Sequence, residues 1–281
     1  MTENLLVFQS DFGRSDGAVS AMYGVALNVS KELKIFDNTH EIPKFNIWEA
    51  SYRLFQTIHY WPKGTVFISI VDPGVGTDRR SIIAKTNTNH YIVTPDNGTL
   101  THLLLHVGIK EARMIDENMH RLPHSGVSHT FHGRDIFAYV AGKLASKRIE
   151  FEDVGGLVEV SSIVTLPTGE AEVQNGILTG YIEMIDRPFG NVWTNIKREQ
   201  FNQIAKNYGQ SFEITISGDD GIKYQNIVSY RRSFGDLNVG EPLVYINSLD
   251  FIGIAMNQDS FADTFEIGFG TDWKVNIRSI E

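Results

Sequence analysis

Asp72, which directly follows a strongly apolar segment, has a position typical of a residue that takes part in chemistry. Residues 65–71 read TVFISIV, a β-branched and aromatic run typical of a buried strand, and Asp72 opens the Asp-Pro-Gly turn after it. In open α/β sheets, ligands bind outside the carboxyl ends of the strands. The pattern therefore places the Asp72 carboxylate where a ligand would bind, although this stretch alone fits an ordinary surface turn equally well.

Other polar side chains have comparable positions. Asp11 lies just beyond a strand predicted for residues 5–9, and two carboxylates at equivalent strand ends suggest one site. His132 precedes a helix predicted for residues 135–144, where free backbone N–H groups can hold an oxygen. From these residues alone, a structural and a functional role for His132 are equally supported.

The common catalytic sequence motifs do not occur. The chain contains no HExxH helix, no G-x-S-x-G elbow and no Walker loop, and Gly74-Val-Gly76 lacks the third glycine of a dinucleotide-binding loop. The spacing of His129 and His132 is a weak indication of a metal site. What remains is a set of aspartate, arginine and histidine without a nucleophilic side chain, which suits the orientation and activation of a water molecule.

Composition limits the classes of partner. The 281 residues carry a formal net charge of -9 without a basic stripe, so we expect no nucleic-acid partner. No apolar run approaches the length of a membrane span, and the first residues do not resemble a signal peptide, so we expect no membrane partner. The chain has no cysteine, which fits a reducing compartment, and we expect a cytoplasmic protein.

The elements that must position these side chains fall into two domains. Through residue 150, predicted strands alternate with predicted helices, which indicates a three-layer α/β domain with a mostly parallel sheet. Residues 151–171 lose helical periodicity and read as a crossover. We place the domain boundaries at 1–160 and 161–281.

The second domain reads as a small all-β unit, either a barrel or a sandwich. Short alternating segments recur there with turn signals between them, and one short helix is possible near residues 199–206. The predicted strands are ILTGYIEMID, NVWTNI, SFEITIS, PLVYINS, FIGIAMN and KVNIRSI.

Several long motifs of this chain resemble those of one enzyme family, the S-adenosylmethionine (SAM) hydroxide adenosyltransferases, which are relatives of the SAM-dependent fluorinase and chlorinase. They follow the family's order and approximate spacing over nearly the whole chain. The motifs are SDFGRSDG, WPKGTVFISIVDPGVGTDRR, TPDNGTLT, SHTFHGRDIFAYVAGKLA and IDRPFGNVWTNI. The resemblance implies an α/β domain followed by a β-barrel. It also implies a homotrimer whose active sites each lie between the N-terminal domain of one subunit and the C-terminal domain of its neighbour.

The resemblance further implies a reaction, the attack of water on C5′ of SAM to release adenosine and methionine. SAM is then the substrate, and neither a cofactor nor a metal is expected. Asp72, Arg79 and His132 match the three positions that distinguish the water-using members, and the halogenases carry other residues there. We expect Asp72 to accept a hydrogen bond or the proton, and Arg79 and His132 to position the water.

Binding roles are implied in the same way. Asp11 resembles the aspartate that accepts from the ribose hydroxyls, Asp186 matches the partner of the methionine ammonium, and Asn191 matches an adenine contact. Ser248 matches a methionine-carboxylate contact. The aromatic candidates are Phe189 and Trp193 in the Asp186 motif, and Phe45 and Tyr230 flanking ribose or adenine. For Trp193, a place in the core of the β domain is an equally good interpretation.

Three other functions stay open at this stage. One is a SAM- or adenosine-binding protein with little catalysis, a second is a SAM-dependent halogenase, and a third is a metal-dependent phosphohydrolase. The chain also departs from the family pattern. The helix after the first motif reads AVSAMYG, and Asp250 stands where a glycine often follows Ile-Asn-Ser. These departures affect the predicted details of the methionine pocket, not the predicted class of reaction.

Overall fold

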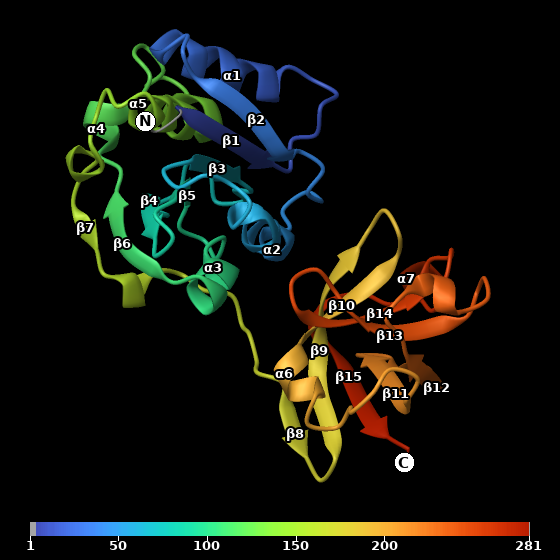
Figure 1. Cartoon of the computed structure of the whole chain (residues 1–281). Coiled ribbons are helices and arrows are strands. Elements are labelled where there is room, and N and C mark those ends of the chain that lie inside the picture. The colour runs from blue at the N-terminus through green and yellow to red at the C-terminus, as the bar shows by residue number, and fades with distance from the viewer. Residues whose placement is uncertain (1–3, 281) are drawn as a thin grey trace. The chain divides into compact units, whose positions relative to one another are not determined.

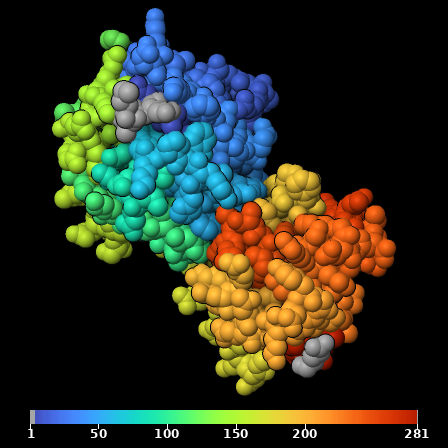
Figure 2. Space-filling view, in the orientation of Figure 1, coloured from blue at the N-terminus to red at the C-terminus, as the bar shows by residue number. Residues whose placement is uncertain are grey.

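The computed structural model describes residues 4–280 and divides into two compact units, Met1–Leu166 and Pro167–Glu281. Each unit packs as a continuous body in the space-filling view, the first coloured blue to green and the second yellow to red (Figure 2). The division falls six residues beyond the 160/161 boundary expected above. The cause is local, because Arg80 Nη1 donates to Ser162 Oγ at 3.0 Å and so ties this segment to the first unit.

The first unit is built on a seven-stranded sheet with the order β2-β1-β3-β5-β4-β6-β7 (Figure 1). Its strands are β1 (Leu5–Ser10), β2 (Lys34–Thr39), β3 (Val66–Ile70), β4 (Ser81–Thr86), β5 (Tyr91–Pro95), β6 (Ile109–Met114) and β7 (Leu157–Val158). Its helices are α1 (Ala18–Val29), α2 (Ile47–Ile58), α3 (Thr101–His106), α4 (Glu117–His120), η1 (Gly133–Ala138), α5 (Tyr139–Ala145), η2 (Phe151–Asp153) and η3 (Val160–Ser162). The α/β class predicted for this unit is confirmed.

The sheet is mixed, whereas the sequence pattern predicts a mostly parallel one. Strands β2, β1, β3 and β5 run parallel to one another, but β4 runs antiparallel to both β5 and β6, and β6 runs antiparallel to β7. The reason is the short connection between β4 and β5, since a parallel pair needs a long crossover and a hairpin does not. The Asn89 N–H donates to the Thr86 carbonyl and closes that turn.

Helices cover both faces of this sheet. Side chains alternate along β1, so Phe8 joins the core cluster formed with α1 and α5, while Gln9 Nε2 donates to the Ala50 carbonyl of α2 on the opposite face. Helix α2 begins as predicted, with Asn46 Oδ1 accepting from the Glu49 N–H. The three-layer arrangement leaves the carboxyl ends of β1 and β3 uncovered by a long helix, and the loops that follow them carry Asp11 and Asp72.

The second unit is a closed seven-stranded barrel. Its sheet has the order β10-β14-β13-β12-β11-β15-β9-β8, and an additional pairing of β10 with β9 closes the ring and leaves β8 outside it. The strands are β8 (Glu172–Gln174), β9 (Ile177–Asp186), β10 (Asn191–Lys197), β11 (Ser211–Gly218), β12 (Gly221–Tyr230), β13 (Pro242–Ile246), β14 (Phe251–Met256) and β15 (Gly270–Ser279). Three helical turns accompany them, α6 (Arg198–Phe201), η4 (Phe234–Asp236) and α7 (Phe261–Thr264). The predicted β-barrel is therefore confirmed.

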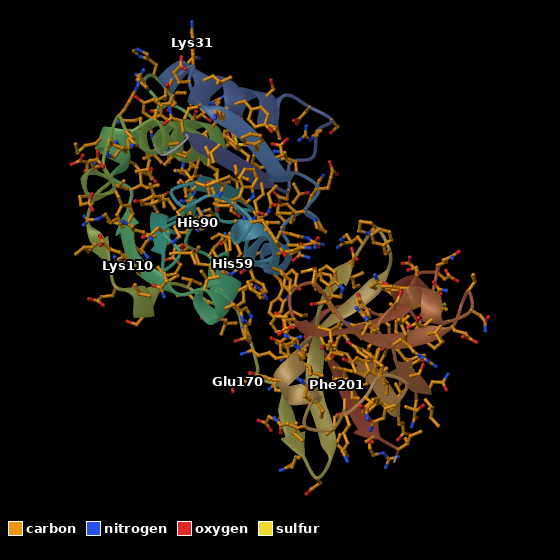
Figure 3. The ribbon with its side chains drawn as sticks, viewed as in Figure 1. Lys31, His59, His90, Lys110, Glu170 and Phe201 are labelled. Carbon is orange, nitrogen blue, oxygen red and sulfur yellow. The ribbon has the colours of Figure 1, made fainter. Side chains whose placement is uncertain are left out.

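Inward-facing side chains, which alternate along the strands, fill the interior of the barrel. Every second residue of β11 is buried, and these side chains pack against the rings of Phe201 and Phe261, both of which are fully buried (Phe201 is labelled in Figure 3). The short helix predicted near residues 199–206 is present as the single turn α6. Two strands absent from the predicted set, β8 and β12, complete the sheet.

Among residues 4–280, no helix has both the length and the apolar character needed to cross a bilayer.

Candidate active site

The carboxyl ends of β1 and β3 meet at one edge of the first unit. Ser10 lies opposite Ile70 in the parallel register, so Asp11 and Asp72 follow side by side in the chain connections beyond that edge. A cavity of about 370 Å³ opens there. Its lining residues are Asp11, Phe12, Asp16, Ala18, Lys44, Phe45, Ile70, Asp72, Val75, Thr130, Phe131, His132 and Gly133. The structure thus brings together four of the residues singled out from the sequence, Asp11, Phe45, Asp72 and His132.

Arg79 clamps the Asp72 carboxylate from behind. Its Nη2 donates to Asp72 Oδ2 at 2.6 Å, and its Nε donates to Oδ1 at 3.0 Å and to Oδ2 at 3.1 Å. The side chains are 9% and 6% exposed respectively, so this forked ion pair is shielded from bulk water. The Cζ atom of Arg79 also lies 5.2 Å from the centre of the Phe137 ring. Arg79 is not among the residues that line the cavity, whereas its two partners Asp72 and His132 are.

The third member, His132, is buried and bonded to the same guanidinium. Arg79 Nη2 donates to His132 Nδ1 at 3.0 Å, and because a guanidinium can only donate, Nδ1 must be the unprotonated nitrogen. Burial lowers the pKa of His132, and the positive charge of Arg79 lowers it further. The imidazole is therefore neutral at neutral pH and carries its proton on Nε2. Among residues 4–280, that Nε2 has no hydrogen-bond partner.

We call Asp72, Arg79 and His132 the Asp–Arg–His group. The neighbouring Arg80 is not part of it. Arg80 Nε donates to Asp96 Oδ2 at 2.7 Å, on the side of the loop that faces Ser162. Of the two adjacent arginines, Arg79 is the one joined to Asp72 and His132, as the motif match predicts.

Asp11 is tied to a strained aromatic residue. The Phe45 N–H donates to Asp11 Oδ2 at 2.8 Å, while Phe45 itself has a φ of 67°, in the left-handed region that a bulky side chain rarely adopts. Its ring is 68% exposed at the cavity. Because the Asp11 Oδ2 bond holds this backbone, a ligand at Asp11 would meet a carboxylate and an aromatic ring already fixed beside each other.

A second, larger cavity of about 900 Å³ lies in the barrel unit. All five residues proposed from the C-terminal motifs line it, namely Asp186, Phe189, Asn191, Trp193 and Ser248. They converge because Asp186 ends β9 and Asn191 begins β10, and the two residues pair directly across the hairpin. The sequence pattern predicts this grouping, and the structure brings these residues together.

Polar contacts fix the walls of this second cavity. Asn191 Nδ2 donates to Asp186 Oδ2 at 3.3 Å, and Trp193 Nε1 donates to Tyr245 Oη at 2.9 Å. Burial raises the pKa of Tyr245 to about 12, so its hydroxyl keeps its proton at neutral pH. Trp193 is buried, as the core interpretation predicts, and still contributes to the cavity lining.

The turn that carries Phe189 depends on a glycine. Gly190 has a φ of 66°, and a Cβ at this position would collide with Ser260. Its N–H donates to the Asp186 carbonyl at 2.8 Å. The tight turn leaves the Phe189 ring 69% exposed at the cavity, where it offers an apolar face to a ligand.

Tyr230 does not join the other predicted residues. Its ring packs in the barrel core, 5.1 Å from the ring of Phe201 and 4.6 Å from that of Tyr208 between centres, and it lines neither cavity. Burial raises the pKa of its hydroxyl to about 12. The last residue of β12 thus has a packing role in the barrel core, and the ligand contact expected for Tyr230 stays a prediction.

Models of the two domains of one enzyme family match this chain. The model of the SAM hydroxide adenosyltransferase N-terminal domain matches residues 6–155, and the model of its C-terminal domain matches residues 180–274. The chain belongs to the SAM hydroxide adenosyltransferase family. This confirms the resemblance seen in the motifs.

Family relatives of known name cover almost the full length. The (R)-S-adenosyl-L-methionine hydrolase of Methanocaldococcus jannaschii is 30% identical over 95% of this chain and 93% of its own. The fluorinase of Actinopolyspora mzabensis is 26% identical over 96% of each chain. A crystal structure described as an uncharacterized conserved protein from Thermotoga maritima superimposes with a TM-score of 0.88, at 31% identity over 97% of this chain and 99% of that chain.

In this family member, several cavity residues were missed by the sequence analysis. Tyr245 and Asn247 precede Ser248 in the same Tyr-Ile-Asn-Ser segment, and both line the barrel cavity. Asn247 Oδ1 accepts from the N–H groups of Leu249 and Phe251 at 2.9 and 3.0 Å, which fixes its amide. The period-two pattern of β13 was the available signal, since it places alternate side chains of one segment on one face.

No group of three or more histidine, aspartate or glutamate side chains within the described part of the chain has the geometry to hold a metal ion.

Proposed function

We propose that this protein hydrolyses SAM to adenosine and L-methionine by attack of water on the ribose C5′ carbon. The observation that carries the proposal is the Asp–Arg–His group itself, in which a shielded carboxylate and a neutral imidazole line one cavity and share one guanidinium. The full-length relatives that are named (R)-S-adenosyl-L-methionine hydrolase support the same reaction.

The proton acceptor in this proposal is Asp72 Oδ1. This oxygen accepts one hydrogen bond from Arg79, whereas Oδ2 accepts two, so Oδ1 keeps the larger capacity for another donor. A water molecule that donates to Oδ1 would lose its proton there as its oxygen bonds to C5′. The electron pair of the C5′–S bond passes to sulfur, which leaves as a neutral thioether and needs no general acid.

His132 has a different task. With Nδ1 accepting from Arg79 and the proton on Nε2, the imidazole is a donor and cannot serve as the first base. A hydrogen bond donated by Nε2–H would engage one lone pair of the water oxygen. The other lone pair would then be oriented for attack on C5′. The role of positioning water, expected for both His132 and Arg79, thus belongs to His132 by contact and to Arg79 through its partners.

The reaction is tested by incubating chelator-treated protein with SAM in oxygen-18 water and identifying the products by mass spectrometry. Adenosine labelled at O5′, together with methionine, is the expected result. A 5′-halogenated adenosine in the presence of halide ions would instead establish the halogenase alternative. Intact SAM that remains tightly bound would indicate a binding protein, and activity lost with the chelator would indicate a metal-dependent enzyme.

Asp186 is proposed to bind the methionine ammonium, and the Asp186→Ala variant tests this. Loss of a paired carboxylate in a cavity should weaken SAM binding about 30-fold, while the dissociation constant of adenosine, which lacks the ammonium, should change less than about twofold. Isothermal titration with both ligands provides the measurement. Asp259→Ala removes another carboxylate from the same cavity and serves as the matched control. An equal loss for adenosine would refute the assigned role.

The homotrimer with active sites shared between subunits, and the cytoplasmic location, are further parts of this proposal. The family resemblance supports the first, and the lack of cysteine supports the second. Multi-angle light scattering should give three times the 31.6 kDa mass of one chain. A monomeric protein with full activity would refute the shared site.

A further inference from the structure

The guanidinium of Arg79 has a third partner outside the Asp–Arg–His group. Arg79 Nη1 donates to Ser81 Oγ at 2.7 Å, and Ser81 is 3% exposed at the start of β4. A hydroxyl has a single proton, and since Ser81 accepts from Arg79, it must donate that proton elsewhere. Its acceptor is Glu117 Oε1, at 2.9 Å. The hydrogen-bond direction is therefore fixed along the whole path from Arg79 to Glu117.

Glu117 is itself held from the far side. Arg121 Nη2 donates to Glu117 Oε2 at 2.9 Å, across one turn of helix α4, so the two carboxylate oxygens have different partners. The charges alternate from Asp72 through Arg79 and Glu117 to Arg121, with the Ser81 hydroxyl between Arg79 and Glu117. Such an arrangement favours one orientation of the central guanidinium over its alternatives.

We propose that Glu117 is a positioning residue for the Asp–Arg–His group, acting through Ser81 and held in place by Arg121. This inference rests on the proposed function for its catalytic consequence. Without the Glu117 carboxylate, the Ser81 hydroxyl loses its charged acceptor and holds the Arg79 guanidinium less firmly. The guanidinium that donates to both Asp72 and His132 is then held less rigidly.

The variant Glu117→Gln tests the proposal by kinetics. We expect kcat for SAM to fall about tenfold with KM changed less than about twofold, because a small misplacement of the reacting groups affects the transition state more than binding. Glu111→Gln is the matched control, since Glu111 is also paired with an arginine, Arg113, at 2.8 Å but has no contact with Arg79. Equal kcat values for the wild type and Glu117→Gln would overturn the proposal.

A pH profile tests whether the charges of Glu117 and Arg121 act on His132. The charged groups that act on His132 are Arg79 and Arg121, which lower its pKa, and Glu117 and Asp72, which raise it. Catalysis needs the neutral imidazole, so activity should fall on acidification through the His132 pKa. Glu117→Gln should move this acid limb to lower pH, and Arg121→Gln should move it to higher pH. If the acid limb of the pH profile stayed in place in both variants, the proposed role of Glu117 would be contradicted.

Two further measurements keep the outcomes distinct. If Glu117→Gln does not fold, Ser81→Ala removes the hydroxyl that joins Arg79 to Glu117, and it should lower kcat to a similar extent without moving the acid limb. NMR titration of the His132 ring follows the same pKa shifts without any need for turnover. Shifts of the predicted sign in a protein that does not hydrolyse SAM would support the link between Glu117 and the Asp–Arg–His group and refute the proposed function. Hydrolysis of SAM without those shifts would refute the role of Glu117 alone.

Discussion

The variant Asp72→Asn should lower kcat for SAM hydrolysis about 1,000-fold while changing the dissociation constant of SAM less than about threefold. Asparagine has the shape of aspartate, and its carbonyl oxygen can still accept from Arg79. Its amide cannot take the proton of the attacking water. Single-turnover kinetics and titration calorimetry measure the two quantities separately.

The chain supplies a close control for this variant. Asp96 has a buried side chain that pairs with the next arginine, the partly exposed Arg80, and it lines neither cavity. Asp96→Asn removes the same charge from a similar setting, so its kcat should stay near that of the wild type. Comparable losses of rate and of SAM affinity in Asp72→Asn would make Asp72 a ligand contact instead of the base.

The second large effect is expected for Arg79→Lys, with kcat about 100-fold lower. The substitution keeps the positive charge but replaces a planar fork by a single ammonium group. One ammonium cannot hold the Asp72 carboxylate, His132 Nδ1 and Ser81 Oγ in their present positions at once. Steady-state kinetics and a thermal unfolding curve of the same preparation separate a loss of rate from a loss of folding.

Arg80→Lys is the matched control, because it makes the same change one residue along the chain. Arg80 pairs with Asp96, so its replacement should change kcat less than about threefold. If Arg80→Lys loses as much activity as Arg79→Lys, the loss comes from a disturbed loop and not from the bonds that Arg79 makes to Asp72 and His132.

Much of the site was predictable because strand ends and turns are local features of sequence. Asp11 and Asp72 each follow an apolar strand, and the parallel pairing of those strands brings them to one edge. Likewise, the hairpin between β9 and β10 makes neighbours of Asp186 and Asn191. In each case, residues close to a chain reversal or a strand end determine the geometry.

The features that sequence reasoning missed depend on packing between distant segments. The alternation of strands and helices does not reveal that β4 pairs antiparallel with β5, since the short hairpin between them carries little turn signal. Tyr230 ends a strand absent from the predicted set, so its direction into the barrel core had no basis in the pattern. Glu117 gave no motif at all, because its contact with Ser81 joins segments 36 residues apart.

The ends of both sheets bear on how copies of this chain associate. A strand at a free edge can pair with another molecule, and proteins limit this with short or charged edge strands. Here the barrel is closed, its extra strand β8 spans three residues, and β7 at one border of the other sheet spans two. The opposite border, β2, carries the charges of Lys34 and Asp37. Neither edge-to-edge aggregation nor strand addition is favoured, so subunits are expected to meet through side-chain surfaces.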